Sequence, residues 1–178
     1  VLLMPGWDSQ ASHLAAIGNA LQAAGFGLVA FDAPAHGQSD GETSSVVDIG
    51  RAMLAIARAH GPFDAVVAHS VGSPAALYAF AHGLTTRASV HIAGPASLER
   101  VLIARSRLAG LPADQLPAFR ALVEADIQAK IADMELESLA RGFRHPALLL
   151  HAPDDGEIPF AESEALNRAW PGSRLVPL

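Results

Sequence analysis

The sequence predicts an α/β fold: a mostly parallel sheet with crossover helices on both faces. The first observation is that short apolar runs alternate along the chain with longer segments of helical periodicity. The second is that 178 residues, 51% hydrophobic and 17% charged, can bury one sizeable core. The third is that helical segments end at Gly25, Gly61 and Gly83, a residue type common at helix ends.

Six apolar runs are the expected strands. Each is too short and too apolar for a half-exposed edge strand, so we expect both faces of each to be covered. The runs are Val1 to Met4, Leu28 to Phe31, Ala65 to Ala68, Ser89 to Ile92, Ala147 to His151 and Arg174 to Val176.

Four segments between these runs are the expected crossover helices, namely Ser12 to Ala24, Ser45 to His60, Val71 to His82 and Glu162 to Ala169. Ser12 is placed to cap the first of them. Ser45 and Asp48 have the spacing of a capping box at the start of the second. Pro74 is confined to the first turn of the third, where proline is tolerated.

The stretch 95–143 breaks the alternation, because it is long and contains Pro112 and Pro117 but no strand. The apolar residues at helical spacing are Leu98, Val101 and Leu102 in a first helix and Phe119, Leu122, Val123 and Ile127 in a second. We expect a small helical cap insertion at 95–143 over the strand ends. The α/β core would then comprise 1–94 and 144–178.

Charge and composition exclude several kinds of partner. The 18 acidic and 12 basic residues are scattered along the chain and give a net charge of −6, which argues against a nucleic acid or an anionic membrane as partner. The apolar runs are far too short to span a bilayer. Without cysteine there are no disulfides and no thiolate chemistry. We expect a soluble protein and assign it to the cytoplasm.

Ser70 lies in Ala68-His69-Ser70-Val71-Gly72, which differs at one position from the G-x-S-x-G nucleophile elbow. A strand that turns directly into a helix strains its corner residue, so the residues two before and two after must be small, as Ala68 and Gly72 are. The helix N-terminus beyond favours developing negative charge. An ordinary serine at a helix start is the alternative; the flanking strand and helix favour a nucleophile.

An acidic loop, residues 151–159, directly follows the apolar run Ala147 to Leu150. An acid at the end of a strand, in a loop fixed by glycine and proline, can orient a histidine imidazole. A solvated acidic turn is one alternative, because Asp-Gly is common in turns. A metal site formed by Asp154, Asp155, Glu157 and His151 is another, although their spacing matches no recognisable ligand pattern.

The turn Pro5-Gly6-Trp7 follows the first expected strand and can supply an oxyanion hole. Gly6 allows close approach of the backbone to a substrate, and the Trp7 N–H would be one donor. The second donor would be the Val71 N–H, immediately after Ser70. The alternative is that Pro-Gly is only a turn.

These residues together resemble the α/β-hydrolase fold family along the whole chain. Phe31 to Asp40 is similar to the family's D-x-P-G-H-G-x-S loop, with Ala35 where glycine is usual. Asp155 to Pro159 is similar to the D-x-x-V-P stretch with the triad acid, which selects Asp155 over Asp154. Pro5-Gly6-Trp7 corresponds to the His-Gly-x oxyanion loop, with proline in place of histidine.

The resemblance implies a catalytic histidine after the last strand, but none of the eight histidines follows Asp155. We therefore expect the sequence to be a fragment that lacks the family's first strands and its C-terminal histidine segment. His69 would point sideways into packing, and His36 would hold its loop by a hydrogen bond. The three expected to be solvated are His13, His60 and His82.

The resemblance and the site chemistry imply a serine hydrolase that cleaves an ester, thioester or related acyl bond. Ser70 would attack, the Trp7 and Val71 N–H groups would hold the oxyanion, and Asp155 would orient a histidine beyond Leu178. No cofactor is expected. The substrate would be a small hydrophobic acyl compound, bound by Trp7 and the cap.

Two other functions remain at this stage. A non-catalytic binding or scaffold protein would keep the sheet without the triad histidine. A nucleotide-binding domain is disfavoured, because no G-x-G-x-x-G follows Met4 and no Walker sequence occurs.

Overall fold

The computed structural model describes residues 1–178, and its centre is one parallel sheet of six strands in the order β2-β1-β3-β4-β5-β6. The fold class predicted from the sequence is confirmed. The strands are β1 (Leu2–Met4), β2 (Val29–Ala30), β3 (Ala65–His69), β4 (Ala88–Ile92), β5 (Ala147–His151) and β6 (Ser173–Pro177).

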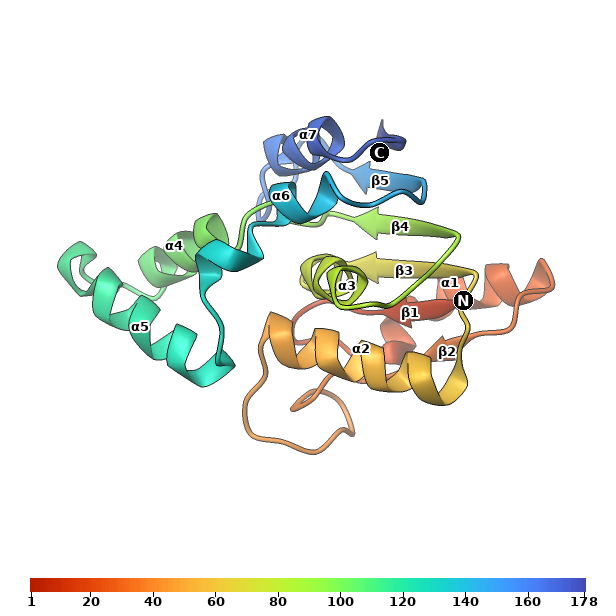
Figure 1. Ribbon diagram of the computed structural model, residues 1–178, viewed down its shortest axis with the longest axis horizontal. Helices are drawn as coiled ribbons and strands as arrows, with labels where there is room; N and C mark the ends of the chain where they lie inside the picture. Colours follow the sequence, from red (N-terminus) through yellow and green to blue (C-terminus); the bar gives the residue numbers. More distant parts are fainter.

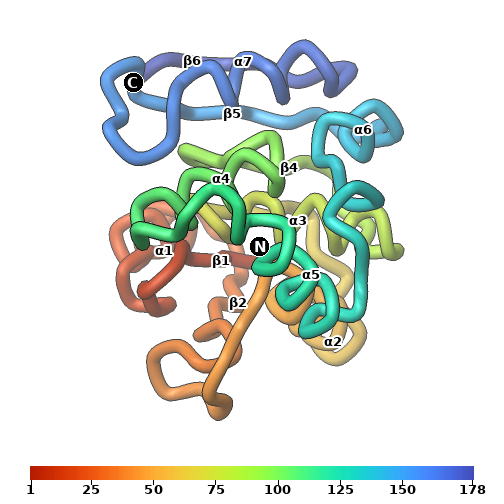
Figure 2. Tube along the Cα trace, turned by 90° about the vertical axis from the view of Figure 1, so that its left-hand side faces the viewer, coloured from red at the N-terminus to blue at the C-terminus, as the bar shows by residue number.

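Helices cover both faces of the sheet, but unequally (Figures 1 and 2). One face packs against α2 (Val46–His60), α3 (Gly72–Ala81), α6 (Leu136–Ala140) and α7 (Phe160–Ala169), which bury the main core. The other face packs against α1 (Ala15–Ala23), where Leu3, Leu14 and Val67 form a smaller cluster. The predicted placement of crossover helices on both faces is therefore correct.

The expectation that every strand is covered on both faces is wrong for the two edges. β2 and β6 are the outermost strands, and Ala30 and Arg174 are exposed. In β5, Leu148 and Leu150 point to the face that carries α1 and stay partly exposed, whereas Leu149 is buried. The physical reason is that α1 alone cannot cover six strands.

The predicted start is correct for α2 but wrong for α1 and α7. Ser45 caps α2 as predicted, because its Oγ accepts the Asp48 N–H at 3.1 Å. Ser12 is not a cap: it lies inside a 3₁₀ turn, Ala11–Leu14, and α1 begins after it. The last helix begins at Phe160 rather than Glu162, directly after Pro159.

The segment 95–143 is helical, with α4 (Leu98–Leu108), α5 (Leu116–Ile127) and α6, and with 3₁₀ turns at Ala113–Gln115 and Ile131–Met134. Figure 1 shows α4 and α5 projecting beyond the carboxyl ends of the strands. Ile127, Ile131 and Met134 form an apolar cluster there with Val47 of α2. By contrast, α6 packs into the main core.

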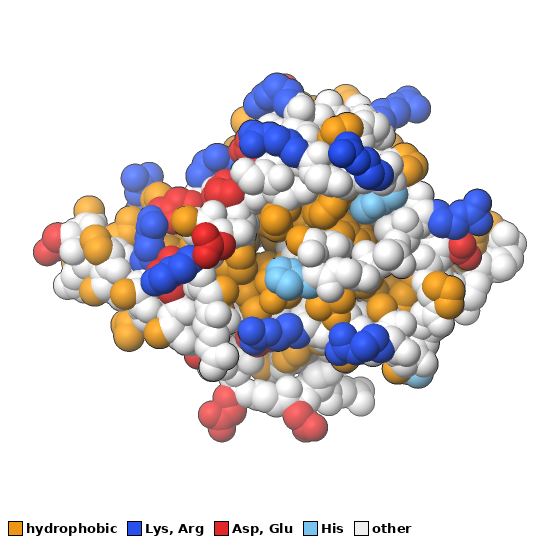
Figure 3. All heavy atoms as spheres, viewed as in Figure 1, with side chains coloured by type: hydrophobic (Ala, Val, Ile, Leu, Met, Phe, Trp, Pro, Cys, Tyr) orange, Lys and Arg blue, Asp and Glu red, His pale blue; other side chains and the backbone are white.

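Acidic and basic side chains are interspersed on the face seen in Figure 3, including the end formed by α4 and α5. No helix is both long and apolar enough to cross a membrane.

Two helical glycines give a matched test of this packing. A Cβ on Gly50 of α2 would lie 2.5 Å from the Tyr78 ring of α3, whereas a Cβ on Gly18 of α1 would make ordinary contact with Leu28 at 3.4 Å. We expect Gly50→Ala to lower the free energy of unfolding by about 1–3 kcal/mol through overpacking. Gly18→Ala should raise it by up to about 1 kcal/mol, since alanine favours helix. Urea denaturation measures both, and equal effects would contradict the close α2–α3 contact.

Candidate active site

Ser70 occupies the sharp turn between β3 and α3, and its φ of 50° lies in the left-handed region that non-glycine residues rarely adopt. Its N–H donates to the Ile92 carbonyl at 2.8 Å, and its own carbonyl accepts the Ser73 N–H at 2.9 Å. The strained corner that the sequence predicted is thus present. It is held by β4 on one side and by the first turn of α3 on the other.

The small residues around Ser70 are required by space. Ala68 is fully buried. A Cβ on Gly72 would lie 2.8 Å from the Pro5 carbonyl oxygen, and a Cβ on Gly6 would lie 3.0 Å from the Ser70 Cβ. The turn after β1 therefore packs directly against the turn after β3. This contact brings Trp7 next to Ser70.

Two backbone donors lie beside Ser70. No hydrogen bond within the protein uses the N–H of Trp7 or of Val71. Val71 adjoins Ser70 at the start of α3, where helix N–H groups favour negative charge. Free donors at this position have the chemistry needed to hold an oxyanion.

A cavity of about 400 Å³ opens in front of Ser70. This volume is in the range of small-molecule sites. Its walls come from both the sheet loops and the 95–143 segment: Trp7, Asp8, Val46, Ser70, Val71, Pro74, Pro95, Leu98, Val101, Arg105 and Ile158. Trp7, Ser70 and Val71 therefore share one mostly apolar cavity.

Asp155 lies in the loop after β5, and its carboxylate is fixed by backbone groups. Oδ1 accepts the N–H groups of Glu157 at 2.8 Å and Ile158 at 2.9 Å. Burial acts to raise the pKa of Asp155, but these two hydrogen bonds and nearby His151 outweigh it and lower the pKa below the usual value. Asp155 is therefore ionised at neutral pH.

The histidine nearest to Asp155 is His151, whose Nε2 lies 3.4 Å from Asp155 Oδ2. His151 is fully buried in β5, where its Nε2 also bonds the Ile158 carbonyl at 2.9 Å and its Nδ1 bonds Ser163 Oγ at 2.7 Å. The sequence did not indicate this contact. No group of three or more metal-ligating side chains is arranged to hold a metal ion.

None of the histidines is hydrogen-bonded to Ser70 Oγ. His69 lies against the turn after β1, because a Cβ on Gly6 would come within 3.0 Å of its Nδ1. Burial lowers the pKa of His69, an effect that the charges of Asp155 and Glu157 partly oppose. His69 is accordingly neutral at neutral pH.

The other predicted histidine positions agree with the structure. His36 is buried, and its Nδ1 donates to the Pro34 carbonyl at 2.8 Å, as expected for a residue that holds its loop. The remaining three, His13, His60 and His82, are exposed.

Asp32 organises the loop after β2. Its carboxylate accepts the N–H of Ala11 at 2.7 Å and of Gln38 at 2.9 Å, which ties this loop to the segment after β1. Ala35 has a φ of 59°, which explains why glycine would suit this position better. A side chain at Gly37 would collide with the Asp32 carboxylate, so that glycine is necessary.

A family model described as the alpha/beta hydrolase family matches residues 1–177. The chain belongs to the alpha/beta hydrolase family. Among curated proteins, none matches the sequence.

Several solved structures have a similar fold. A lipase-esterase related protein from Clostridium acetobutylicum is 16% identical, with a TM-score of 0.73 over 99% of this chain and 84% of its own. A monoacylglycerol lipase from Paleococcus ferrophilus is 19% identical, with a TM-score of 0.74 over 99% of this chain and 82% of its own. An esterase from Rhodococcus sp. is 19% identical, with a TM-score of 0.72 over 99% of this chain and 80% of its own. Family membership supports a hydrolase activity in general.

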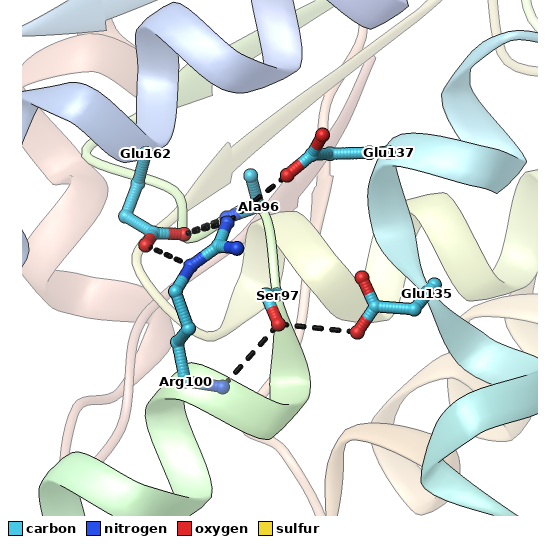
Figure 4. A network of polar contacts seen from close by, with 6 residues as sticks. All are labelled: Ala96, Ser97, Arg100, Glu135, Glu137 and Glu162. Atoms are coloured by element: carbon cyan, nitrogen blue, oxygen red, sulfur yellow. Dashed lines mark hydrogen bonds and ion pairs between the residues drawn. The ribbon is translucent and has the colours of Figure 1, made fainter.

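An ion-pair network that the sequence did not indicate joins the 95–143 segment to the core (Figure 4). Glu162 of α7 is 9% exposed and accepts two hydrogen bonds from Arg100 of α4, at 2.5 and 3.1 Å, and one from the Ala96 N–H at 2.8 Å. Arg100 also reaches Glu137 of α6 at 3.1 Å. The hydrogen bond to Glu162 raises the pKa of Arg100, which burial partly opposes. We call Arg100, Glu137 and Glu162 the α4 clamp.

A second unexpected network lies behind Ser70. Ser73 Oγ bonds His91 Nδ1 at 2.7 Å, His91 Nε2 bonds Ser89 Oγ at 3.0 Å, and Ser89 Oγ bonds His145 Nε2 at 3.2 Å. Burial lowers the pKa of His91 to about 3, and His145 acts in the same direction. The imidazole of His91 is therefore neutral, and the network satisfies the polar groups beneath the first turn of α3.

The Asp32 loop gives a test by pH. Hydrogen bonds from Ala11 and then Gln38 lower the pKa of Asp32 below 3.8, its unfolded value. The stabilisation is thus complete above about pH 3.8 and is lost as the pH falls through the folded pKa. We expect Asp32→Asn to destabilise the protein near neutral pH and the difference from wild type to shrink under acid. Urea denaturation from neutral pH to below pH 3.8 measures the difference in unfolding free energy between the two proteins. A difference that is constant or widens at low pH would contradict the role of the Asp32 carboxylate in holding the loop.

The α4 clamp gives a test by substitution. Removing Glu162 leaves the half-exposed Arg100 and the Ala96 N–H without their partner, and losing the charge-assisted hydrogen bonds of such a partly buried pair costs about 1–3 kcal/mol. We expect this loss of unfolding free energy in Glu162→Ala. Glu164→Ala, at an exposed position of the same helix, should stay within about 0.5 kcal/mol of wild type. Equal losses in the two variants would rule out the clamp as a stabilising contact.

Proposed function

We propose that the protein is a serine hydrolase that cleaves an ester, thioester or related acyl bond through an acyl-enzyme on Ser70. The observation that carries the proposal is the strained Ser70 at the β3–α3 turn, which opens into a cavity beside the free N–H groups of Trp7 and Val71. This is the arrangement that a nucleophilic serine and its oxyanion donors need.

In the proposed reaction, Ser70 Oγ attacks the carbonyl carbon and its proton passes to an imidazole. The Trp7 and Val71 N–H groups stabilise the oxyanion. The bond to the alcohol or thiol then breaks, and the imidazolium gives its proton to the leaving group. Water next attacks the acyl-enzyme by the same route and releases the carboxylic acid.

Asp155 is the proposed orienting acid. The backbone N–H groups occupy Oδ1, so Oδ2 is the oxygen that can receive an imidazole N–H. In this proposal, that imidazole is the one that takes the proton of Ser70 Oγ. The chemistry requires no cofactor.

The substrate that suits the cavity has an apolar acyl part. Val46, Leu98 and Val101 line its walls, and Trp7 stands at its mouth with 44% of its surface exposed. The segment 95–143 would act as a cap that contributes α4 to this wall. A small hydrophobic acyl compound is therefore the proposed partner.

A non-catalytic binding protein is the second candidate function. It is favoured by two observations: Asp155 contacts the buried His151, and no histidine is hydrogen-bonded to Ser70 Oγ. Under this hypothesis the cavity would bind an acyl ligand without cleaving it.

Covalent labelling separates the two candidates. We expect the protein expressed from its complete reading frame to react with a fluorophosphonate probe, because the activated Ser70 hydroxyl attacks phosphorus as it would a carbonyl. Ser70→Ala should reduce labelling to background and lower kcat for ester hydrolysis by at least about 10³-fold. Ser138→Ala, at an exposed serine, is the matched control and should label like wild type. A folded protein that does not label, or that labels after loss of Ser70, would favour the binding function.

A further inference from the structure

A second apolar hollow, of about 220 Å³, adjoins the cavity at Ser70. The two cavities share four lining residues, Val46, Leu98, Val101 and Arg105, so they meet at this junction. The second hollow lies between the start of α2, α4, α5 and the turn Ile131–Met134. We call it the distal chamber.

The walls of the distal chamber are almost entirely aliphatic or aromatic. Beyond the junction, its apolar lining includes Phe119, Val123, Ile127 and Met134. Ile127 and Met134 are buried in the apolar cluster that anchors this part of the chain, and Val123 packs on that cluster. Packed apolar side chains therefore form this wall of the chamber.

Polar groups at the chamber are few and mostly engaged elsewhere. Arg105 stands at the junction, and its guanidinium reaches toward Glu157, 3.9 Å away in the loop that holds Asp155. Ser45 is occupied as the cap of α2. Ser44 adds one buried hydroxyl without a partner. A charged or heavily hydroxylated ligand would lose its hydrogen bonds to water here without replacing them.

We propose that the distal chamber holds the tail of a linear acyl chain whose carbonyl carbon lies at Ser70. The inference rests on the proposed function and deepens it: the substrate class becomes esters of unbranched acids that reach past Val46, Leu98 and Val101. Short acyl groups such as acetyl occupy only part of the first cavity. Chains that continue through the junction bury further methylenes, which strengthens their binding.

The test is the dependence of kcat/KM on acyl length, with p-nitrophenyl esters from acetate to decanoate. For the wild-type protein expressed from its complete reading frame, we expect kcat/KM to rise by about fourfold for each added methylene while the chain enters the chamber. A value that stays flat beyond butyrate would overturn the inference.

Two neighbouring residues of α5 provide a matched pair. Val123 lines the chamber, whereas Leu122 is 71% exposed and does not line it. Val123→Trp fills the space, so the ratio of kcat/KM for octanoate to that for acetate should fall by at least about tenfold. Leu122→Trp should leave the ratio unchanged. Equal ratios in the two variants would overturn the inference.

Thermal melting shows whether Val123→Trp remains folded. If it does not, a further variant still tests the inference. Phe119→Ala enlarges the chamber and should shift the preference toward decanoate relative to octanoate. An unchanged preference in a folded Phe119→Ala protein would count against the chamber as the tail site.

A binding measurement distinguishes failure of this inference from failure of the proposed function. In the Ser70→Ala protein, the fluorescent fatty acid cis-parinaric acid should bind and be displaced by decanoate but not by acetate. Val123→Trp should weaken this binding, and Leu122→Trp should not. Binding with this pattern but no hydrolysis of any ester would support the chamber and overturn the hydrolase. Hydrolysis of esters without this binding pattern would support the hydrolase and overturn the chamber as the tail site.

Discussion

The left-handed backbone of Ser70 is the constraint on which the rest of the site depends. A φ of 50° at a serine costs on the order of 1–3 kcal/mol and persists only when its surroundings enforce it. Here β4 binds the Ser70 N–H, α3 binds its carbonyl, and Gly72 allows the helix to start against the turn after β1. Strands β1, β3 and β4 therefore meet at one residue, which projects from the carboxyl edge of the sheet.

The same kind of strain recurs around this edge. Asp8, Ala35 and Ala93 also have φ values between 50° and 59°, and each lies in the loop that follows β1, β2 or β4. The remaining non-glycine case, Gln128, ends α5, where a left-handed residue is an ordinary helix cap. Strain is thus concentrated in the loops at the carboxyl edge of the sheet, and the core beneath supplies the stability that holds these loops.

The sequence predicted those features that depend on near neighbours. The β3–α3 turn was visible because Ala68 and Gly72 flank Ser70, and the α2 cap was visible in Ser45 and Asp48. The exposure of the edge strands β2 and β6 could not be predicted, because an apolar run does not reveal how many strands lie beside it. The α4 clamp was equally hidden: Arg100 and Glu162 lie 62 residues apart and meet only after the sheet has formed.

The geometry of Asp155 allows both its contact with His151 and its proposed role as the orienting acid. Both backbone N–H groups bind Oδ1, so the orientation of the carboxylate does not depend on any imidazole. His151 Nε2 lies 2.9 Å from the Ile158 carbonyl and 3.4 Å from Oδ2, so its stronger bond is to the carbonyl. His151 therefore makes only a weak contact with Asp155 Oδ2. Because a carboxylate oxygen can accept two hydrogen bonds, Oδ2 can still accept another N–H. A carboxylate that is ionised, fixed in orientation and able to accept another N–H has the properties that the orienting acid of a serine hydrolase requires.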